Sequence, residues 1–529
     1  MANRKEQAEL FKTIWDIAND LRGAIDGWTF KAYVLGAIFY RYISEDICQY
    51  ISKLQIEAGE PDVDYATVKD EDVDSEEFRN MMVDEKGYFI KPSRLFQNVE
   101  AKADQDQNLN DTLAGIFREI EATSTGKESE LRIKGLFSDF AVNNSQIGNS
   151  VEIRNKLLAK VLHKVKNMEL GKKLEDNNND VFGDAYEFLM KMYASQAGKS
   201  GGEFFTPQEV SELLAQIAAY GTEDIKKVYD PCCGSGSLLL KFQKIHGCNI
   251  EDLRYYGQEV NPTTYNLCRI NMFLHHVNYN NFDIQLDDTL LNPRHIDMVE
   301  DPKVGVFDCI VSNPPYSLKW IGKENPLLMN DPRYAEAGVL APASSADLAF
   351  TLHMYYHLKN TGVCAIVEFP GVLYRSGAEK QIREYLLKEN AIDTVIQLPA
   401  NLFFGVGIAT CIIVLKKPAR RIGDNSVLFI DASREFVKEG NKNYLSEENQ
   451  KNIFGYYKDR KDVDYTCKLV TVDDILANDA NLSVSSYVEQ EDTREKIDIK
   501  KVNEKIENLL AENTKLNAEI SKIINELGE

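Results

Sequence analysis

The chain has 529 residues, 43% of them hydrophobic, and carries a formal net charge of −22 at pH 7. This length is too great for one ordinary core and predicts two or three domains, and no apolar run approaches the ~20 residues of a membrane span. The negative charge argues against a protein that binds nucleic acid by itself, because phosphate neutralisation needs a basic surface; it allows one that reaches DNA through a partner or a local basic patch.

Residues 1–165 are predicted to form a helical N-terminal domain. The polar start "MANRKEQAELFK" lacks the apolar core of a secretory signal, so we expect a cytoplasmic protein. Apolar residues then recur at helical spacing, at Leu10, Ile14, Ile17 and Leu21. The pattern continues through 30–51 and resumes at 145–165, whereas the acidic stretch 62–78 is expected to be a solvated loop.

Residues 166–485 are predicted to form an α/β domain with a mainly parallel, doubly wound, Rossmann-like sheet, because short apolar strands alternate with helical stretches. The expected strands are Lys227–Tyr229, Arg254–Gln258, Asp283–Leu286, Val306–Ser312, Val363–Phe369, Thr394–Leu398, Ala409–Leu415 and one within 426–433. The stretch 469–478 resembles a capping segment.

Residues 486–529 are predicted to end in a coiled-coil helix that assembles with a partner. Spacings of four and three alternate along Val502, Ile506, Leu509, Asn513, Leu516, Ile520, Ile523 and Leu527. The polar Asn513 within this seam is a common means of fixing the register. The alternative is an amphipathic helix that packs on its own domain.

A glycine-rich turn, "DPCCGSGS", follows the first expected strand and precedes a helix that starts near Ser237. Ligands of doubly wound folds bind at the carboxyl ends of strands, and an acidic strand end beside Gly234 and Gly236 suits a cationic ligand that carries an amino-acid group. The phosphate-binding alternatives fit poorly, because there is no GxGxxG and "AGKS" at 197–200 has Tyr193 where a P-loop needs glycine.

Two further strand ends carry carboxylates. Glu259 closes the second strand, where it can hold both hydroxyls of a ribose. Asp288 follows the third strand, where it can accept from an adenine amino group, although its neighbour Asp287 could take this role instead.

The strand "VFDCIVS" leads into "NPPY", residues 313–316. An aromatic amine is a poor nucleophile because its lone pair is delocalised. The side-chain oxygen of Asn313 and the rigid backbone carbonyl of Pro314 could both accept from such an amine and localise the lone pair. Tyr316 offers a face on which a flipped base can stack, a contact worth ~1–3 kcal/mol.

The chain resembles the modification (HsdM) subunit of type I restriction-modification systems, a family of adenine-N6 DNA methyltransferases. "GGEFFTPQEV", "DPCCGSGS" and "NPPY" stand in that family's order, and "LPANLFFGVGIATCIIVLKK" resembles its late sheet region. The resemblance covers nearly the whole chain. It implies the class I methyltransferase fold, S-adenosylmethionine (SAM) as cofactor and 6-methylaminopurine as product.

The resemblance also implies site residues and partners. The catalytic residues would be Asn313, Pro314, Pro315 and Tyr316. The cofactor-binding residues would be Glu203, Phe204, Phe205, Thr206, Pro207, Asp230, Pro231, Gly234, Ser235, Gly236, Glu259 and Asp288. The partners would be DNA, reached within the complex, a specificity subunit (HsdS) that binds two copies of this chain, and a restriction and translocase subunit (HsdR).

Other motifs in the sequence resemble those of different enzymes, but each fits its motif poorly. Pro231-Cys232 is similar to the nucleophile of cytosine-5 methylation but stands on the wrong loop, and loop packing is expected. His353 and His357 lie one helical turn apart, but Met354 occupies the glutamate position of HExxH. The cysteines form no CxxC pair, and we predict no catalytic metal. The alternative functions are an NPPY-type protein glutamine methyltransferase and a non-catalytic assembly subunit.

Overall fold

The computed structural model describes most of the chain and divides it into two units. The described residues are 27–168, 206–245, 251–403, 407–440, 442–490 and 499–528, with a few single positions before residue 27 and between 168 and 206. Residues 1–488 form one compact unit and residues 489–529 form a second. Within the described ranges, no helix is both long enough and apolar enough to cross a membrane.

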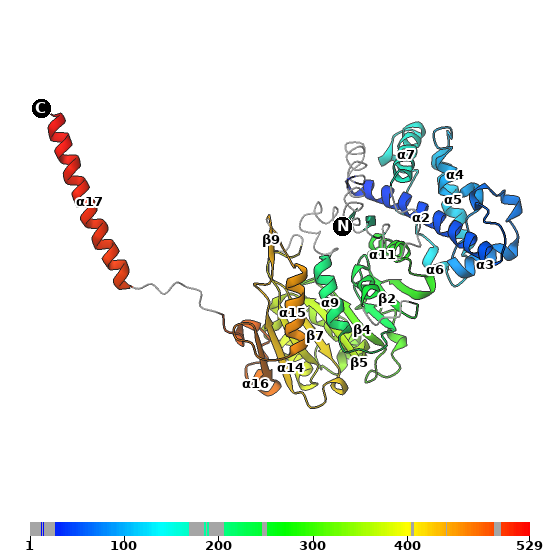
Figure 1. Ribbon diagram of the computed structural model, residues 1–529. Helices are drawn as coiled ribbons and strands as arrows, with labels where there is room; N and C mark the ends of the chain where they lie inside the picture. Colours follow the sequence, from blue (N-terminus) through cyan, green and yellow to red (C-terminus); the bar gives the residue numbers. More distant parts are fainter. Residues whose placement is uncertain are drawn as a thin grey trace. The chain divides into compact units, whose positions relative to one another are not determined.

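Helices dominate the described chain up to residue 168 (Figure 1). They are α2 (Gly27–Glu57), α3 (Glu76–Lys86), α4 (Phe96–Glu100), α5 (Leu109–Thr123), α6 (Glu130–Ile133) and α7 (Val151–Lys166). The segment 62–78 is not the fully solvated loop that we expected. Tyr65 within it is buried and donates a hydrogen bond to the Ile90 carbonyl (2.9 Å), so an aromatic side chain anchors this acidic segment to the core.

Among the described residues, a nine-stranded sheet forms the centre of the larger unit, in the order β11-β8-β6-β7-β5-β4-β1-β2-β3. The strands are β1 (Lys227–Asp230), β2 (Arg254–Glu259), β3 (Phe282–Leu286), β4 (Phe307–Ser312), β5 (Leu358–Glu368), β6 (Ile392–Gln397), β7 (Cys411–Lys416), β8 (Ser426–Asp431) and β11 (Cys467–Thr471). Only β7 and β11 run antiparallel to their neighbours. The prediction of a mainly parallel sheet is confirmed.

Successive side chains of each strand enter two different hydrophobic cores, because they point to opposite faces of the sheet. In β5, Val363 belongs to one core and Cys364 to the other. The first face is covered by α9 (Gln208–Ala219), α10 (Ser237–Leu240), α11 (Pro262–Leu274) and α15 (Glu447–Asp459). The second face is covered by α12 (Pro332–Ala335), α13 (Asp347–His357), α14 (Ala378–Lys388) and α16 (Val472–Ala477).

Two sequence predictions need correction. β5 begins at Leu358 rather than Val363, because Leu358 already pairs with Phe307; the register then shifts, since residues 359–362 of β5 are extra residues between this pair and the next, Cys309 with Val363. The expected capping segment 469–478 is instead the end of β11 and the short helix α16, and β11 closes one edge of the sheet by antiparallel pairing with β8. A small hairpin of β9 (Val437–Glu439) and β10 (Lys442–Tyr444) was not predicted.

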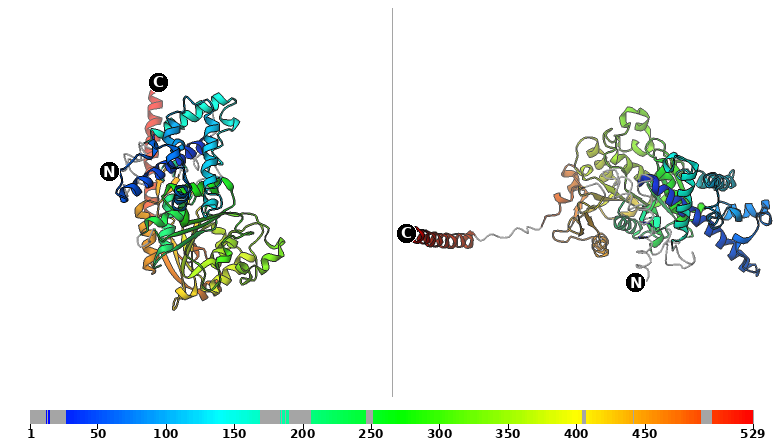
Figure 2. Two further views of the ribbon diagram at one scale, coloured as in Figure 1. Left: turned by 90° about the vertical axis from the view of Figure 1, so that its right-hand side faces the viewer. Right: turned by 90° about the horizontal axis from the view of Figure 1, so that it is seen from above.

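Polar contacts join the helical N-terminal region to the sheet region through α11. The guanidinium of Arg269 donates to the carbonyls of Leu131 (2.9 Å) and Lys134 (2.9 Å). The amide of Asn266 donates to the Ser138 hydroxyl (2.7 Å). In Figure 1 α11 accordingly lies beside α2 and α6, and blue and green ribbons adjoin in both views of Figure 2.

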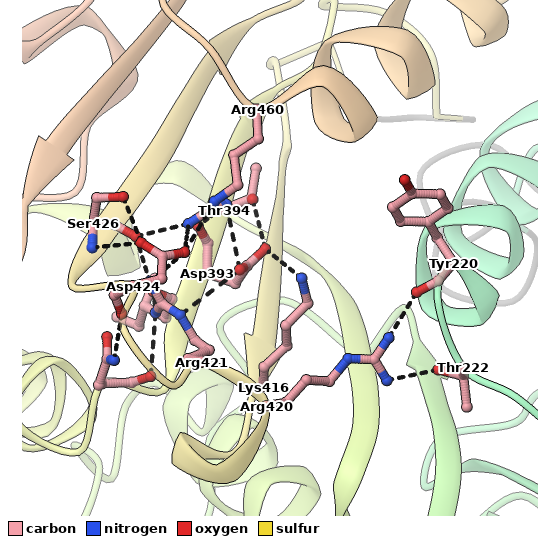
Figure 3. A network of polar contacts seen from close by, with 12 residues as sticks. Tyr220, Thr222, Asp393, Thr394, Lys416, Arg420, Arg421, Asp424, Ser426 and Arg460 are labelled. Carbon is pink, nitrogen blue, oxygen red and sulfur yellow. Dashed lines mark hydrogen bonds and ion pairs between the residues drawn. The ribbon is translucent and has the colours of Figure 1, made fainter.

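A network of buried charges holds the amino-terminal end of β6 to its surroundings (Figure 3). The carboxylate of Asp393, 2% exposed, is within 3.1 Å of Lys416 Nζ, 3.3 Å of Arg460 Nη1 and 3.8 Å of Arg421 Nε. Asp424 lies 2.7 Å from Arg460 Nη2. We call these five residues the Asp393 network; it lies at the edge of the sheet opposite the carboxyl ends of the parallel strands.

The second unit contains α17 (Ile499–Leu527), a single uninterrupted helix. Each of its described residues is exposed, including the apolar seam residues Leu509 (57%) and Leu516 (53%). An apolar seam that is left exposed along a helix is typical of a surface that packs against another helix.

Candidate functional site

The candidate site lies where the strand order reverses. The chain runs outward from β1 through β2 and β3 and then returns to the other side of β1 as β4. In doubly wound sheets this switch point is the usual ligand site. Here the two strands end on Asp230 and Ser312, and the Ser312 hydroxyl donates a hydrogen bond to Asp230 Oδ1 (2.7 Å). This bond links the glycine-rich turn directly to the NPPY loop.

The turn after β1 requires glycine at two positions. Gly234 has φ +53° and Gly236 has φ +79°, in the left-handed region that L side chains rarely adopt. A Cβ on Gly236 would also lie 2.7 Å from the Cys268 sulfur of α11. The buried amide of Asn271 on α11 donates to the Ser235 carbonyl (2.8 Å), so α11 supports the turn from behind.

Two carboxylates flank this turn, the buried Asp230 and the half-buried Glu259. Burial raises the pKa of Asp230 to about 7, although the Ser312 hydroxyl and the Cys232 amide partly offset this effect. Burial also raises the pKa of Glu259, whose Oε2 accepts from the Gly234 amide (3.1 Å). Among the described residues, neither carboxylate has a Lys or Arg partner.

This set of groups fits a ligand that brings its own positive charge and hydroxyl groups. Asp230 is a desolvated carboxyl group whose ionised form a cationic amino group would stabilise. Glu259 stands at the end of the adjacent strand and can accept hydrogen bonds from a diol. SAM carries an ammonium group and a ribose diol, so the residues that are present fit it.

The loop after β3 holds two further carboxylates, Asp287 and Asp288. Both oxygens of Asp287 are engaged, Oδ1 by Asn292 (3.1 Å) and Oδ2 by Arg294. Within the described chain, Asp288 accepts through Oδ1 alone, from the amides of Leu290 (2.8 Å) and Leu291 (3.0 Å). Asp288 therefore keeps more accepting capacity for a ligand than Asp287.

Arg333 braces the loop after β3 from within the protein. Its side chain is fully buried, and it donates to the carbonyls of Thr289 (2.8 Å) and Leu290 (2.8 Å) while Asp331 neutralises its charge at 2.6 Å. The Thr289 hydroxyl in turn donates to the Pro231 carbonyl (2.6 Å). The loops after β1 and β3 are thus held together.

Asn313 is fixed at both ends of its carboxamide. Its Nδ2 donates to the Thr206 hydroxyl (3.0 Å), and its Oδ1 accepts from the Tyr316 hydroxyl (2.5 Å). A carbonyl oxygen has two lone pairs, so Oδ1 can accept a second hydrogen bond. Pro314 is buried, and among the described residues no hydrogen bond reaches its carbonyl.

The segment before α9 is only partly described. Thr206 is 6% exposed and meets Asn313, so it approaches the NPPY loop. The expected cofactor contacts Glu203, Phe204 and Phe205 lie outside the described residues. Pro207 follows directly as the N-cap of α9, and Pro315 is half-buried.

Comparison with known proteins assigns the chain to a family. A family model described as N-6 DNA Methylase matches residues 177–496. The chain belongs to the N-6 DNA methylase family. A second family model, described as HsdM N-terminal domain, matches residues 10–165.

Individual relatives of this N-6 DNA methylase agree with the assignment. The type I restriction enzyme MpnII methylase subunit of Mycoplasma pneumoniae is 45% identical over 98% of this chain and 96% of its own length. The MjaVIII methylase subunit of Methanocaldococcus jannaschii is 36% identical over 62% of this chain and 57% of its own length. The crystal structure of a type I restriction-modification methyltransferase subunit from Streptococcus thermophilus is 36% identical, with a TM-score of 0.80 over 91% of this chain and 100% of that one.

These findings confirm three predictions. The chain is a methylase subunit of the type I restriction-modification kind, it carries an N6-adenine DNA methyltransferase domain, and its sheet has the class I methyltransferase fold. The family and the fold are those of SAM-dependent enzymes.

The two motifs set aside in the sequence have structural explanations in this methylase. Burial raises the pKa of the Cys232 thiol well above its usual range, which makes it a poor nucleophile. His353 and His357 are both fully buried behind β1, where His353 Nε2 meets the Tyr229 hydroxyl (2.9 Å) and its Nδ1 faces Arg333 (3.0 Å). Burial lowers the pKa of both imidazoles.

Sequence reasoning missed three residues of the site. No role was predicted for Ser312, although a hydroxyl at the buried end of an apolar strand indicates a polar partner nearby. Asn271 and Asp347 gave no signal of this kind, because both lie on helices and only the fold brings them to the loops. Asp347 accepts from the backbone amide of Ser317, directly after NPPY.

Proposed function

We propose that this chain, as the modification subunit of a type I complex, binds SAM between the β1 turn and β2 and transfers its methyl group to the N6 amino group of an adenine flipped out of DNA. The observation that carries this proposal is the joining of two motifs at the switch point. Ser312 bonds to Asp230, and the next residue is Asn313, whose carboxamide is held by Thr206 and Tyr316.

SAM is proposed to bind the glycine-rich turn with its amino-acid end and β2 with its ribose. Asp230 would hold the ammonium group, and Gly234 and Gly236 would admit the ligand close to the backbone with Pro231 and Ser235. Glu259 would accept from the ribose hydroxyls. Asp288 is proposed to accept from the adenine amino group, because Asp287 is already engaged by Arg294. When bound, SAM supplies an electrophilic methyl group.

The remaining segment before α9 is proposed to close the site. Thr206, which accepts from Asn313, would also contact the cofactor. Glu203, Phe204, Phe205 and Pro207 would complete this side of the site, as the family resemblance implies.

The NPPY loop is proposed to prepare the amino group. Asn313 Oδ1 and the Pro314 carbonyl accept hydrogen bonds from the adenine N6 and localise its lone pair. Pro315 stiffens the loop because its ring fixes φ. Tyr316 stacks on the flipped base while its hydroxyl keeps Asn313 oriented.

Access to DNA is proposed to depend on partners. A net charge of −22 disfavours binding of DNA by this chain alone, so a specificity subunit would read the sequence and present the adenine. The exposed seam of α17 is proposed to dock on that subunit, with two copies of this chain for each one, and a separate restriction and translocase subunit would complete the assembly. None of the eight described cysteines forms a disulfide bond, as suits a complex working in the cytoplasm.

Methyl transfer from labelled SAM tests the function. The chain, purified with its specificity subunit, is incubated with duplex DNA, and the product is digested with nuclease or with protease. Label released as 6-methyladenine by nuclease supports the proposal. Absence of transfer to DNA contradicts it, and label released only by protease would favour the glutamine methyltransferase alternative.

A further inference from the structure

The chain takes an unusual backbone conformation directly after NPPY. Ser317 has φ +52°, in the left-handed region, although it is not glycine. A residue other than glycine is strained in this region, and it persists there only when its surroundings enforce it. The direction in which the chain leaves Tyr316 is therefore imposed by other residues.

Asp347, the first residue of α13, imposes this conformation. Its Oδ1 and Oδ2 both accept from the Ser317 amide, at 3.0 and 3.1 Å. Its side chain is buried, with the residue 1% exposed, and the Ser345 hydroxyl donates to Oδ2. Hydrogen bonds to an ionised acceptor are roughly twice as strong as neutral ones, so this carboxylate is a firm clamp on one backbone amide.

The segment before α13 adds further hydrogen bonds to the residues that follow Ser317. The Ala346 amide donates to the Leu318 carbonyl (2.9 Å). Further along, the Trp320 amide donates to the Ala343 carbonyl (3.0 Å), and the Trp320 indole donates to the Pro342 carbonyl (3.0 Å). Residues 342–347 thus run beside residues 317–320 and bind them at each end.

The helix that carries Asp347 is itself fixed in the core. One turn further along α13, the buried Thr351 hydroxyl donates to Glu368 Oε1 (2.9 Å) at the carboxyl end of β5. Burial raises the pKa of Glu368 well above its usual range, which favours its neutral form. α13 is therefore fixed relative to the sheet, and its first residue, Asp347, holds the loop that follows NPPY in a defined position.

We propose that Asp347 is a positioning residue for methyl transfer. By holding Ser317 in the left-handed conformation, it directs Tyr316 so that its hydroxyl stays on Asn313 Oδ1. Asp347 touches neither cofactor nor base in this scheme and acts only through the loop. The inference rests on the proposed function of Asn313 and deepens it.

The test compares Asp347→Ala, Asp347→Asn and the double variant Asp347→Ala/Ser317→Gly, each in full-length chain with the specificity subunit. Asp347→Ala is expected to lower kcat at least about tenfold and to leave the Kd of SAM within about twofold. Asp347→Asn retains one acceptor oxygen and is expected to keep most of the activity. Glycine adopts positive φ without cost, so the kcat of the double variant is expected to be at least about threefold higher than that of Asp347→Ala.

Asp70→Ala provides the matched control. Asp70 also accepts from a backbone amide and a serine hydroxyl, both of Ser93, at 2.9 and 2.6 Å, but it lies in the helical N-terminal region. It is expected to retain wild-type kcat. A fully active Asp347→Ala variant would overturn the inference. It would also be overturned if Asp347→Ala lost SAM binding, thermal stability and activity together, and if neither Asp347→Asn nor the added Ser317→Gly restored them. A wild-type complex without methyl transfer would instead count against the proposed function.

Discussion

The Tyr316 hydroxyl donates a hydrogen bond of 2.5 Å to Asn313 Oδ1, the oxygen that would receive the adenine amino group. With Thr206 bound to Nδ2, the carboxamide can neither rotate nor exchange its oxygen for its nitrogen without losing a bond. Tyr316 therefore has two roles in the proposed site, because its ring is a stacking surface and its hydroxyl orients the acceptor.

Tyr316→Phe separates these roles, because it keeps the ring and removes the hydroxyl. A single hydrogen bond contributes about 0.5–1.5 kcal/mol, so kcat is expected to fall about 3- to 10-fold while the KM for DNA stays the same. Tyr316→Ala removes the stacking face as well and is expected to raise that KM. Steady-state methylation assays distinguish the two, and an unchanged kcat for Tyr316→Phe would refute the orienting role.

Asn313→Ala is expected to abolish methyl transfer and to retain SAM binding within about twofold, because Asn313 belongs to the substrate side of the site. Calorimetric titration with SAM and methylation of duplex DNA measure the two properties on the same preparation. Loss of SAM binding would show that the NPPY loop has been assigned to the wrong ligand.

SAM binding is expected to tighten with pH. In the free protein, burial raises the pKa of Asp230 to about 7, so this carboxyl is mostly protonated near pH 6 and cannot pair with an ammonium group. As pH rises from about 6 to about 7.5, the ionised fraction and hence the SAM affinity should rise roughly five- to tenfold, while the SAM amino group remains largely charged.

Asp230→Asn is the control for this pH dependence. It should bind SAM weakly and with a shallower pH profile; Glu259, whose pKa is also raised by burial, would account for the remaining slope. A wild-type affinity that falls over the same pH interval would contradict the role of Asp230.

Much of the site was predictable because its residues follow strand ends. Asp230 and Glu259 end their strands, and Asp288 and Asn313 follow theirs within two residues. Parallel strands bring their carboxyl ends to one edge, so sequence order alone places these residues together. Ser312 and Asp347 show why the rest was not predictable. Their roles depend on which hydrogen-bonding group of a distant loop comes within 3 Å, and this is decided by the packing of α13 and the pairing of β1 with β4.

The same limit explains the errors in the fold. β5 begins early because Leu358 pairs with Phe307 ahead of a register shift, which no local pattern in residues 358–362 indicates. The end of β11 was predicted to belong to a capping segment, because a short edge strand buries little surface and has no distinct strand pattern. The apolar strand β4 was predicted to within one residue, whereas β7 begins two residues later than predicted and ends one residue later.

Gly236→Ala is expected to impair SAM binding and lower thermal stability. Its Cβ would meet the Cys268 sulfur at 2.7 Å, and the residue would be held at φ +79°. Together these effects are expected to cost about 2–4 kcal/mol. The double variant Gly236→Ala/Cys268→Ala removes the sulfur but not the backbone strain, so thermal unfolding should recover only in part. Full recovery would mean that the positive φ at position 236 does not strain an alanine.

Asp393→Ala is expected to destabilise the fold without affecting the site. It leaves Lys416, Arg421 and Arg460 without their shared acceptor, and breaking a buried ion network in this way costs about 3–5 kcal/mol. Asp459→Ala breaks only an exposed pair with Lys461 and should cost less than about 1 kcal/mol. Thermal unfolding measures the difference, and the SAM affinity of the folded variant should match wild type.

Leu509→Glu/Leu516→Glu tests the exposed seam of α17. Both residues are more than half exposed in the chain alone, so the change should leave its thermal stability and SAM affinity unaltered. On a partner helix the two carboxylates would be desolvated, and affinity for the specificity subunit should fall at least about 100-fold. Glu512→Gln, which changes a charge off the seam, is the control. Size-exclusion chromatography of the mixed subunits would show the loss of the complex, whereas an intact complex would exclude the seam as the docking surface.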